Sequence, residues 1–183
     1  LIDQNGNITG RCKRKMYSGY VTKYLFGDIF IHSCGSMFPR KALEEIGGFD
    51  ETLRFSGDYD LWLRLSLKYP FIGLPQPTFK RRRHQSNLSA TSSQSQIIQS
   101  NVLKRFYYEK GGQKIVPKRS AMRSLSRQEY RVAMSAWRQG EAAKAKTYLK
   151  RSFTRHPNIK AVLRMGQIML KGSGSGRGAY ENL

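Results

Sequence analysis

Gly-Gly-Phe-Asp-Glu at residues 47–51 and Ser-Gly-Asp-Tyr-Asp-Leu-Trp-Leu-Arg-Leu at residues 56–65 are the most informative segments of this chain. The glycine pair permits a sharp backbone turn. Ser56 is a plausible N-cap for a helix over residues 57–68, with Asp58 and Asp60 in its first turn, where a helix favours anions. Two carboxylates beside a glycine-rich turn suit a site that removes a proton from a hydroxyl group. An apolar face supports the helix, formed by Tyr59, Leu61, Trp62 and Leu65.

The sequence around this helix alternates between helical and extended patterns. A short helix over residues 41–46 is expected to end at Gly47 and Gly48, and Pro70 ends the longer one. A strand end with an Asn-Gly turn and further β-rich segments are predicted at residues 1–10, 29–32 and 71–80.

From about residue 93 onward the pattern is helical. Apolar side chains recur up to Gly111 and Gly112, and a basic linker is predicted over residues 113–125. Ser126 and Glu129 fit a capping box that begins a helix ending at Gly140. Two further helices are expected, one over residues 141–154 and one beginning at Pro157.

Charge divides the chain into two unlike parts. The net charge of the 183 residues is +21. Residues 1–79 carry 10 basic and 8 acidic side chains, whereas residues 80–183 carry 23 basic and 4 acidic ones. The basic part favours a polyanion such as anionic lipid headgroups or nucleic acid; a solvated basic surface without a dedicated partner is an equal alternative.

Targeting and redox signals are sparse. Cys12 and Cys34 form neither a disulfide framework nor a Cys-x-x-Cys metal motif, which fits a reducing compartment. No apolar run approaches the length of a membrane-spanning helix, and no signal peptide is visible. Because the chain opens with Leu1 in what reads as mid-domain sequence, we expect its native N-terminus to lie upstream.

Four blocks of sequence together resemble the C-terminal half of the catalytic domain of family 2 glycosyltransferases, which are inverting enzymes of the GT-A fold. The resemblance covers about residues 1–92 and implies a partial GT-A (Rossmann-like) domain there. With the α-helical hairpin region that the residue pattern predicts over residues 93–171, the expected fold class is α/β. Residues 172–183 are expected to be a flexible tail or an added linker. The blocks are Ser-Cys-Gly-Ser-Met-Phe-Pro-Arg at 33–40, Leu-Glu-Glu-Ile-Gly-Gly-Phe-Asp-Glu at 43–51, residues 56–65, and Arg-Arg-His-Gln-Ser-Asn-Leu-Ser at 82–89.

The resemblance assigns a general base and an acceptor wall. Asp58 matches the aspartate that takes a proton from the acceptor hydroxyl, although the glutamate that often precedes it is Gly57 here. The acceptor side is assigned to Gly47, Gly48, Asp50 and Asp60, with Asp60 as a positioning or capping group. The alternative is that both acids of the helix only cap it.

The donor side and the metal follow from the same resemblance. Ser33, Gly35, Ser36 and Arg82 match the loop and the arginine that contact the donor sugar and its diphosphate, and His84 matches a metal-ligating or diphosphate-contacting histidine. A divalent metal, Mg or Mn, is expected for the full-length enzyme. Its Asp-x-Asp ligands and the nucleotide-binding half are expected upstream of Leu1, so we expect the present chain to be inactive alone.

The helical end resembles one tetratricopeptide-like unit over residues 126–159, which needs a partner surface to bury its apolar face. Its basic surface suits a peripheral contact with the inner face of a membrane in a cytoplasmic protein that acts on a saccharide, lipid-linked or protein acceptor. Alternatively, the helices form a basic binding module for nucleic acid. We expect no nucleic acid, because a stacking platform would expose aromatic side chains that here have core spacing. A third hypothesis is an inactive scaffold.

Overall fold

The computed structural model describes residues 1–11, 15–82, 93–157 and 159–170. The elements of the first part are α1 (Thr22–Gly27), the 3-10 helix η1 (Ser33–Gly35), α2 (Arg40–Glu45) and α3 (Gly57–Lys68). The second part contains α4 (Ser93–Tyr108), the 3-10 helix η2 (Gly112–Lys114), α5 (Lys118–Arg138), α6 (Ala142–Arg155) and α7 (Ile159–Leu170).

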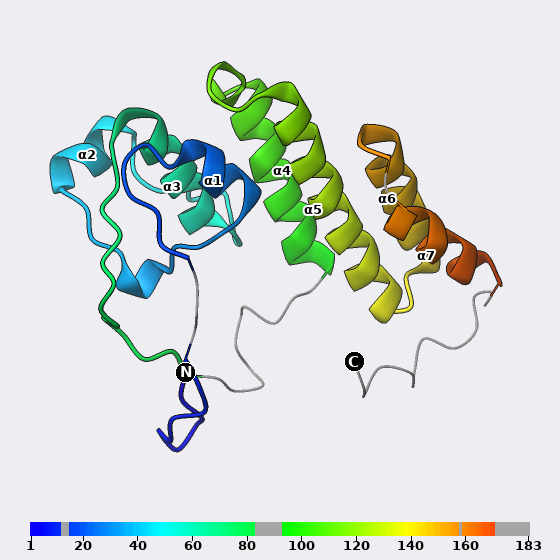
Figure 1. The fold of residues 1–183 in the computed structure, drawn as a ribbon, viewed down its shortest axis with the longest axis horizontal. Helices are drawn as coiled ribbons and strands as arrows, with labels where there is room; N and C mark the ends of the chain where they lie inside the picture. Colours follow the sequence, from blue (N-terminus) through cyan, green and yellow to red (C-terminus); the bar gives the residue numbers. More distant parts are fainter. Residues whose placement is uncertain (12–14, 83–92, 158, 171–183) are drawn as a thin grey trace.

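The helices follow one another across the molecule (Figure 1). The short helices α1 to α3 and their long connections form one end, α4 and α5 lie side by side in the middle, and α6 and α7 form the other end. Both α1 and α3 pack on the α4–α5 pair, which therefore joins the loop-rich end to the helical end.

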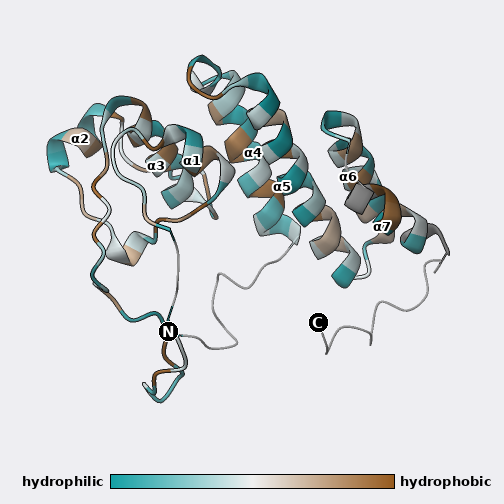
Figure 2. Cartoon of the chain, in the orientation of Figure 1, coloured by the Kyte–Doolittle hydropathy of each residue, from teal (hydrophilic) through white to brown (hydrophobic). Residues whose placement is uncertain are grey.

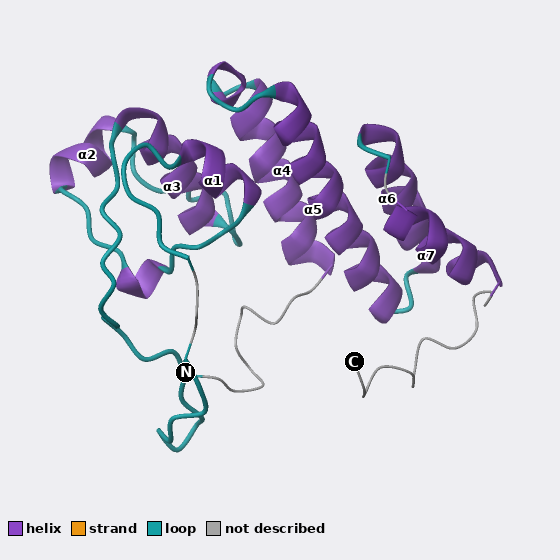
Figure 3. Cartoon of the chain, in the orientation of Figure 1, coloured by secondary structure: helices purple, strands orange, loops and turns teal. Residues whose placement is uncertain are grey.

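The predicted α/β fold is wrong for the described part of the chain. Figure 3 shows helices and loops only, and the β-type pairing there consists of isolated bridges. Gly19 and Phe71, for example, exchange two backbone hydrogen bonds of 2.7 and 2.8 Å, but no neighbouring residues continue the ladder. The β-rich patterns report a local preference, whereas a strand exists only if a partner strand supplies hydrogen bonds. A partial GT-A sheet is therefore absent from the described residues.

The largest apolar core joins both parts of the chain. Tyr59 and Trp62 of α3 are buried against α1, α4 and α5, which confirms the predicted apolar face of α3. The Tyr59 hydroxyl donates to the carbonyl of Leu25 at 2.8 Å, and burial raises the pKa of this hydroxyl well above its usual range. Residues from both parts of the chain contribute to this core. They include Phe26 from the first part and, from the second part, Val102, Leu103, Phe106, Ala121 and Leu125.

Helix α5 begins earlier than the sequence predicted. It starts at Lys118 directly after Pro117, so residues 118–125 are helical and the predicted basic linker is wrong there. Pro117 was the usable signal, since proline often marks a helix start. Ser126 and Glu129 are therefore not a capping box but buried residues in the middle of α5.

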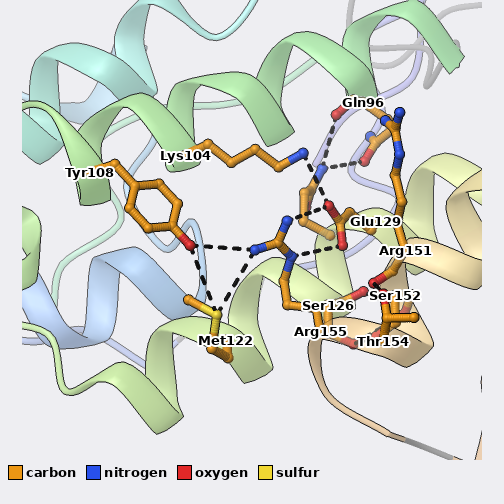
Figure 4. A network of polar contacts seen from close by, with 11 residues as sticks. Gln96, Lys104, Tyr108, Met122, Ser126, Glu129, Arg151, Ser152, Thr154 and Arg155 are labelled. Atoms are coloured by element: carbon orange, nitrogen blue, oxygen red, sulfur yellow. Dashed lines mark hydrogen bonds and ion pairs between the residues drawn. The ribbon is translucent and has the colours of Figure 1, made fainter.

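A buried carboxylate ties three helices together (Figure 4). Glu129 of α5 is fully buried and pairs with Lys104 of α4 at 3.0 Å and with Arg155 of α6 at 3.0 and 3.1 Å. Beside it, Ser126 and Ser152 each donate a hydrogen bond of 2.8 Å to the other's backbone carbonyl. Small side chains at this contact let α5 and α6 approach closely.

Candidate functional site

Asp58 meets the 3-10 helix η1 at the start of α3. Its side chain is half-buried, and its Oδ2 accepts a hydrogen bond of 2.5 Å from the exposed hydroxyl of Ser33. Its Oδ1 accepts the backbone N–H of Tyr59 at 2.8 Å. None of the basic side chains in the described ranges forms an ion pair with Asp58. The structure thus brings the predicted base beside a residue of the predicted donor loop.

The entry to α3 has an unusual backbone. Ser56 is the N-cap residue of α3, as predicted, but it adopts a left-handed conformation with φ of 61° and its side chain makes no capping hydrogen bond. Instead, its backbone carbonyl accepts the N–H of Asp60 at 3.0 Å. A non-glycine residue rarely adopts this conformation. The sharp turn sets the point at which the first turn of α3, with Asp58, begins.

Asp60 has a different environment from Asp58. It is 3% exposed, and its Oδ2 pairs with Nε of Arg64 at 2.7 Å. Its Oδ1 pairs with Nη2 of Arg105, on α4, at 2.9 Å. The same Nη2 atom lies 2.8 Å from Oδ2 of Asp50. We call Asp50, Asp60, Arg64 and Arg105 the Asp–Arg cluster.

The Asp–Arg cluster holds the glycine turn in place. Gly47 and Gly48 have φ of 78° and 66°, which glycine adopts without strain. Arg64 donates hydrogen bonds to the carbonyls of Ile46 at 2.7 Å and Gly48 at 2.8 Å. One guanidinium group of α3 therefore contacts both the turn and Asp60.

The pKa values of two members of the cluster are shifted. The Thr52 hydroxyl and then Arg105 donate hydrogen bonds that lower the pKa of Asp50 below its ordinary value. Burial lowers the pKa of Arg105, but hydrogen bonds to Asp60 and Asp50 outweigh it, so that pKa is raised. The charged forms of Asp50 and Arg105 are thus favoured by the hydrogen bonds between them.

The other residues assigned to the donor have protein partners. A side chain at Gly35 would collide with the ring of Phe79, which itself packs edge-on against His32. The Ser36 hydroxyl donates to the carbonyl of Ser33 at 2.9 Å. Gly35 is therefore explained by packing inside the protein.

Arg82 lies at the N-terminal turn. Its Nη1 donates to the carbonyls of Asp3 and Gln4 at 3.0 and 2.7 Å. Asp3 in turn accepts hydrogen bonds from Asn5 and Asn7, which closes the turn. These contacts hold the Arg82 guanidinium group against the N-terminal turn.

The described residues do not fit the expected divalent metal. Within them, no group of three or more His, Cys, Asp or Glu side chains lies close enough to hold an ion. Asp58 and Asp60 flank Tyr59, but both oxygens of Asp60 are already paired with guanidinium groups. The predicted ligand His84 lies outside the described residues.

A surface hollow of about 310 Å³ opens beside the Asp–Arg cluster. It lies over α4, and a smaller pocket of about 10 Å³ lies between α1, α4 and α5. Asp58 lines neither of these two spaces. The hollow is lined by Leu53, Asn101, Val102, Lys104, Arg105 and Glu109.

Sequence reasoning missed the two arginines of the cluster. Arg64 follows Asp60 by four residues on one helix, a spacing that indicates an ion pair and was available as a signal. Arg105 lies on α4, 45 residues after Asp60 in the sequence, and no local sequence pattern predicts that these two residues are in contact.

Comparisons with known proteins point to one family. The sequence matches the family described as "Glycosyltransferase like family 2" over residues 3–156, from the N-terminal turn through α6. A protein of Rickettsia bellii (strain RML369-C), named "Uncharacterized glycosyltransferase", is 29% identical over 83 residues. That alignment covers 43% of this chain and 12% of the relative, so the chain spans a small part of that protein's length. No solved structure matches the chain. In the described ranges, no helix is long and apolar enough to cross a membrane.

Proposed function

Because this chain belongs to the glycosyltransferase-like family 2, we propose that it forms part of an inverting glycosyltransferase in which Asp58 is the general base. The donor is a nucleotide sugar, and the acceptor is a hydroxyl group of a growing polysaccharide or glycoconjugate. One observation carries the choice of base. Asp58 is accessible and unpaired with any described cation, whereas Asp50 and Asp60 are held by guanidinium groups.

The proposed step balances as a single displacement. The acceptor oxygen attacks the anomeric carbon while its proton moves to a carboxylate oxygen of Asp58. The bond from the anomeric carbon to the donor phosphate oxygen breaks, and the nucleoside diphosphate leaves with the electron pair. Attack from the face opposite the leaving group inverts the anomeric configuration.

The surrounding residues support the orientation of this base. Ser33 donates to Asp58 Oδ2 and limits the rotation of the carboxylate. Arg64 fixes the turn at Gly48 close to the α3 helix that carries Asp58. We propose that this turn forms one wall of the acceptor site and that the η1 segment faces the donor. The divalent ion implied by the resemblance would need ligands outside the described residues, and we expect the chain alone to be inactive.

The test uses the complete native protein to which the chain belongs. Asp58→Asn should lower the rate of sugar transfer by about 100-fold or more, the usual effect of removing a general base. Binding of the nucleotide sugar, measured by calorimetry, should change little, because the proposed role is in proton transfer. The matched control is Asp28→Asn, which removes an exposed acid at the end of α1. A normal transfer rate in Asp58→Asn would rule out this base.

A further inference from the structure

The helical end of the molecule has an unbalanced positive charge. Residues 142–170 contain no acidic side chain. Glu141, just before them, pairs with Lys144 at 2.6 Å, and the buried Glu129 is already paired with Lys104 and Arg155. The nearby acids are therefore used within the protein, and the exposed Lys146 and Lys150 of α6 form no ion pair with an acid of the described residues.

The outer face of α6 carries two of these cations and an aromatic ring. Lys146, Lys150 and Phe153 are exposed and follow a spacing of four and then three residues, which places them on one side of the helix. The adjoining side of the helix, with Ala145 and Leu149, is buried against α5. Phe153 is 38% exposed although phenylalanine is usually buried.

Helix α7 adds exposed aliphatic side chains. Met165 packs toward the small core between α5 and α6, whereas Val162 and Leu163 are 45% and 61% exposed. In Figure 2, brown apolar segments of α7 lie next to teal polar ones. Helices α6 and α7 pack on each other and are joined by a short connection. We call Lys146, Lys150, Phe153, Val162 and Leu163 the α6–α7 surface.

We propose that the α6–α7 surface docks on an anionic phospholipid bilayer. Lysines contact the headgroups, and Phe153, Val162 and Leu163 enter the boundary between headgroups and acyl chains. A helix with an apolar side, a basic polar side and no acids is the type that binds in this interfacial plane. This proposal does not depend on the assignment of Asp58 or on transferase activity.

A lipid surface fits this region better than nucleic acid does. Single-stranded nucleic acid is bound by cations together with exposed aromatic rings that stack on bases. The α6–α7 surface has one exposed aromatic ring, Phe153, but it also exposes two aliphatic side chains, which gain free energy in a bilayer but not against a phosphate backbone.

A second basic face on α5 provides the contrast. Arg119, Arg123, Arg127 and Arg131 recur every fourth residue and are all exposed, so the cations of α5 follow one stripe. The large apolar and aromatic residues that follow along α5, Tyr130, Met134 and Trp137, pack against the α5–α6 core. This stripe offers charge without apolar side chains free to insert.

Vesicle flotation tests the proposal with matched variants. The protein is mixed with phosphatidylcholine vesicles, with and without phosphatidylserine, at low and physiological salt. Lys146→Glu/Lys150→Glu should weaken binding to the anionic vesicles roughly tenfold or more, since each surface cation contributes about 1 kcal/mol. Arg119→Glu/Arg123→Glu changes the net charge equally and should weaken binding clearly less. Circular dichroism confirms that all variants are folded.

A second pair of variants tests insertion. Val162→Ser/Leu163→Ser should weaken vesicle binding at least about fivefold, because it removes aliphatic groups that leave water on binding. The control is Ile72→Ser/Leu74→Ser, which alters side chains that are 85% and 57% exposed elsewhere. Three outcomes overturn the proposal: equal loss in both charge-reversal pairs, unchanged binding of the serine variant, or binding of a single-stranded oligonucleotide without vesicle binding.

Discussion

The Ser33 hydroxyl lies 2.5 Å from Oδ2 of Asp58, although the two residues are 25 positions apart in the sequence. The contact joins the η1 segment to the first turn of α3. The contact also distinguishes Asp58 from the two other aspartates of this region. The side-chain partner of Asp58 is a neutral hydroxyl, whereas Asp50 and Asp60 form ion pairs with arginines. The chemistry proposed for Asp58 depends on this difference.

Ser33→Ala should reduce sugar transfer by about tenfold in the complete protein, since it removes one charge-assisted hydrogen bond. The loss should fall on kcat more than on KM, because the hydroxyl orients the base rather than retaining substrate. Steady-state kinetics provide the measurement, with Ser120→Ala on the exposed side of α5 as the control. An unaltered kcat would show that Ser33 does not orient Asp58.

Arg105→Met should lower the free energy of unfolding by about 3 kcal/mol, because it removes one partner of the buried Asp60 carboxylate. Urea denaturation measures this change. Arg40→Met is the control, since its ion pair with Glu44 is highly exposed and should contribute less than about 1 kcal/mol. Similar losses in both variants would mean that the Asp–Arg cluster adds no specific stability.

The lowered pKa of Asp50 predicts a pH dependence of stability. Its stabilising contribution should be complete above the ordinary value of 3.8 and should be lost as the pH falls through the lower pKa of the folded state. The difference in unfolding free energy between wild type and Asp50→Asn should therefore be constant near neutral pH and shrink in acid. Denaturation at a series of pH values, with Glu51→Gln as the control for an added amide, measures this. A difference that grows in acid would contradict the assignment.

Glu129→Gln should destabilise the protein by roughly 3 kcal/mol, because it leaves Lys104 and Arg155 without their buried counter-charge. The backbone amides at the C-terminal end of α6 should become less protected in hydrogen exchange, since Arg155 anchors that end of the helix. Glu141→Gln, which affects a partly exposed ion pair with Lys144 and a hydrogen bond from Ser93, should have a small effect. Equal effects of the two substitutions would contradict the three-helix role of Glu129.

Local patterns predicted helices better than they predicted tertiary contacts. The α3 helix, its apolar face and the glycine turn follow from residues close together in the sequence, and the structure confirms them. The sheet was wrong because extended preference at residues 71–80 cannot supply the partner strand that a sheet needs. The start of α5 was misplaced because Ser126 and Glu129 imitate a cap signal while serving buried contacts.

The candidate site was predicted only in part, because local sequence patterns do not show which distant segments pack together. Asp58 and Ser33 were identified separately from a resemblance, and the structure places them in contact. Arg105 was missed, because a salt bridge between α3 and α4 depends on how the helices pack and leaves no periodic trace in either segment.

The shared core has a practical consequence for dissecting this protein. A recombinant product that stops near residue 82 would keep Tyr59, Trp62 and Phe26 but lose the helices that shield them from water. Each large apolar side chain left uncovered forfeits about 1.5–3 kcal/mol. Such a truncated polypeptide should aggregate or remain unfolded, so the two halves must be produced together for any assay of either.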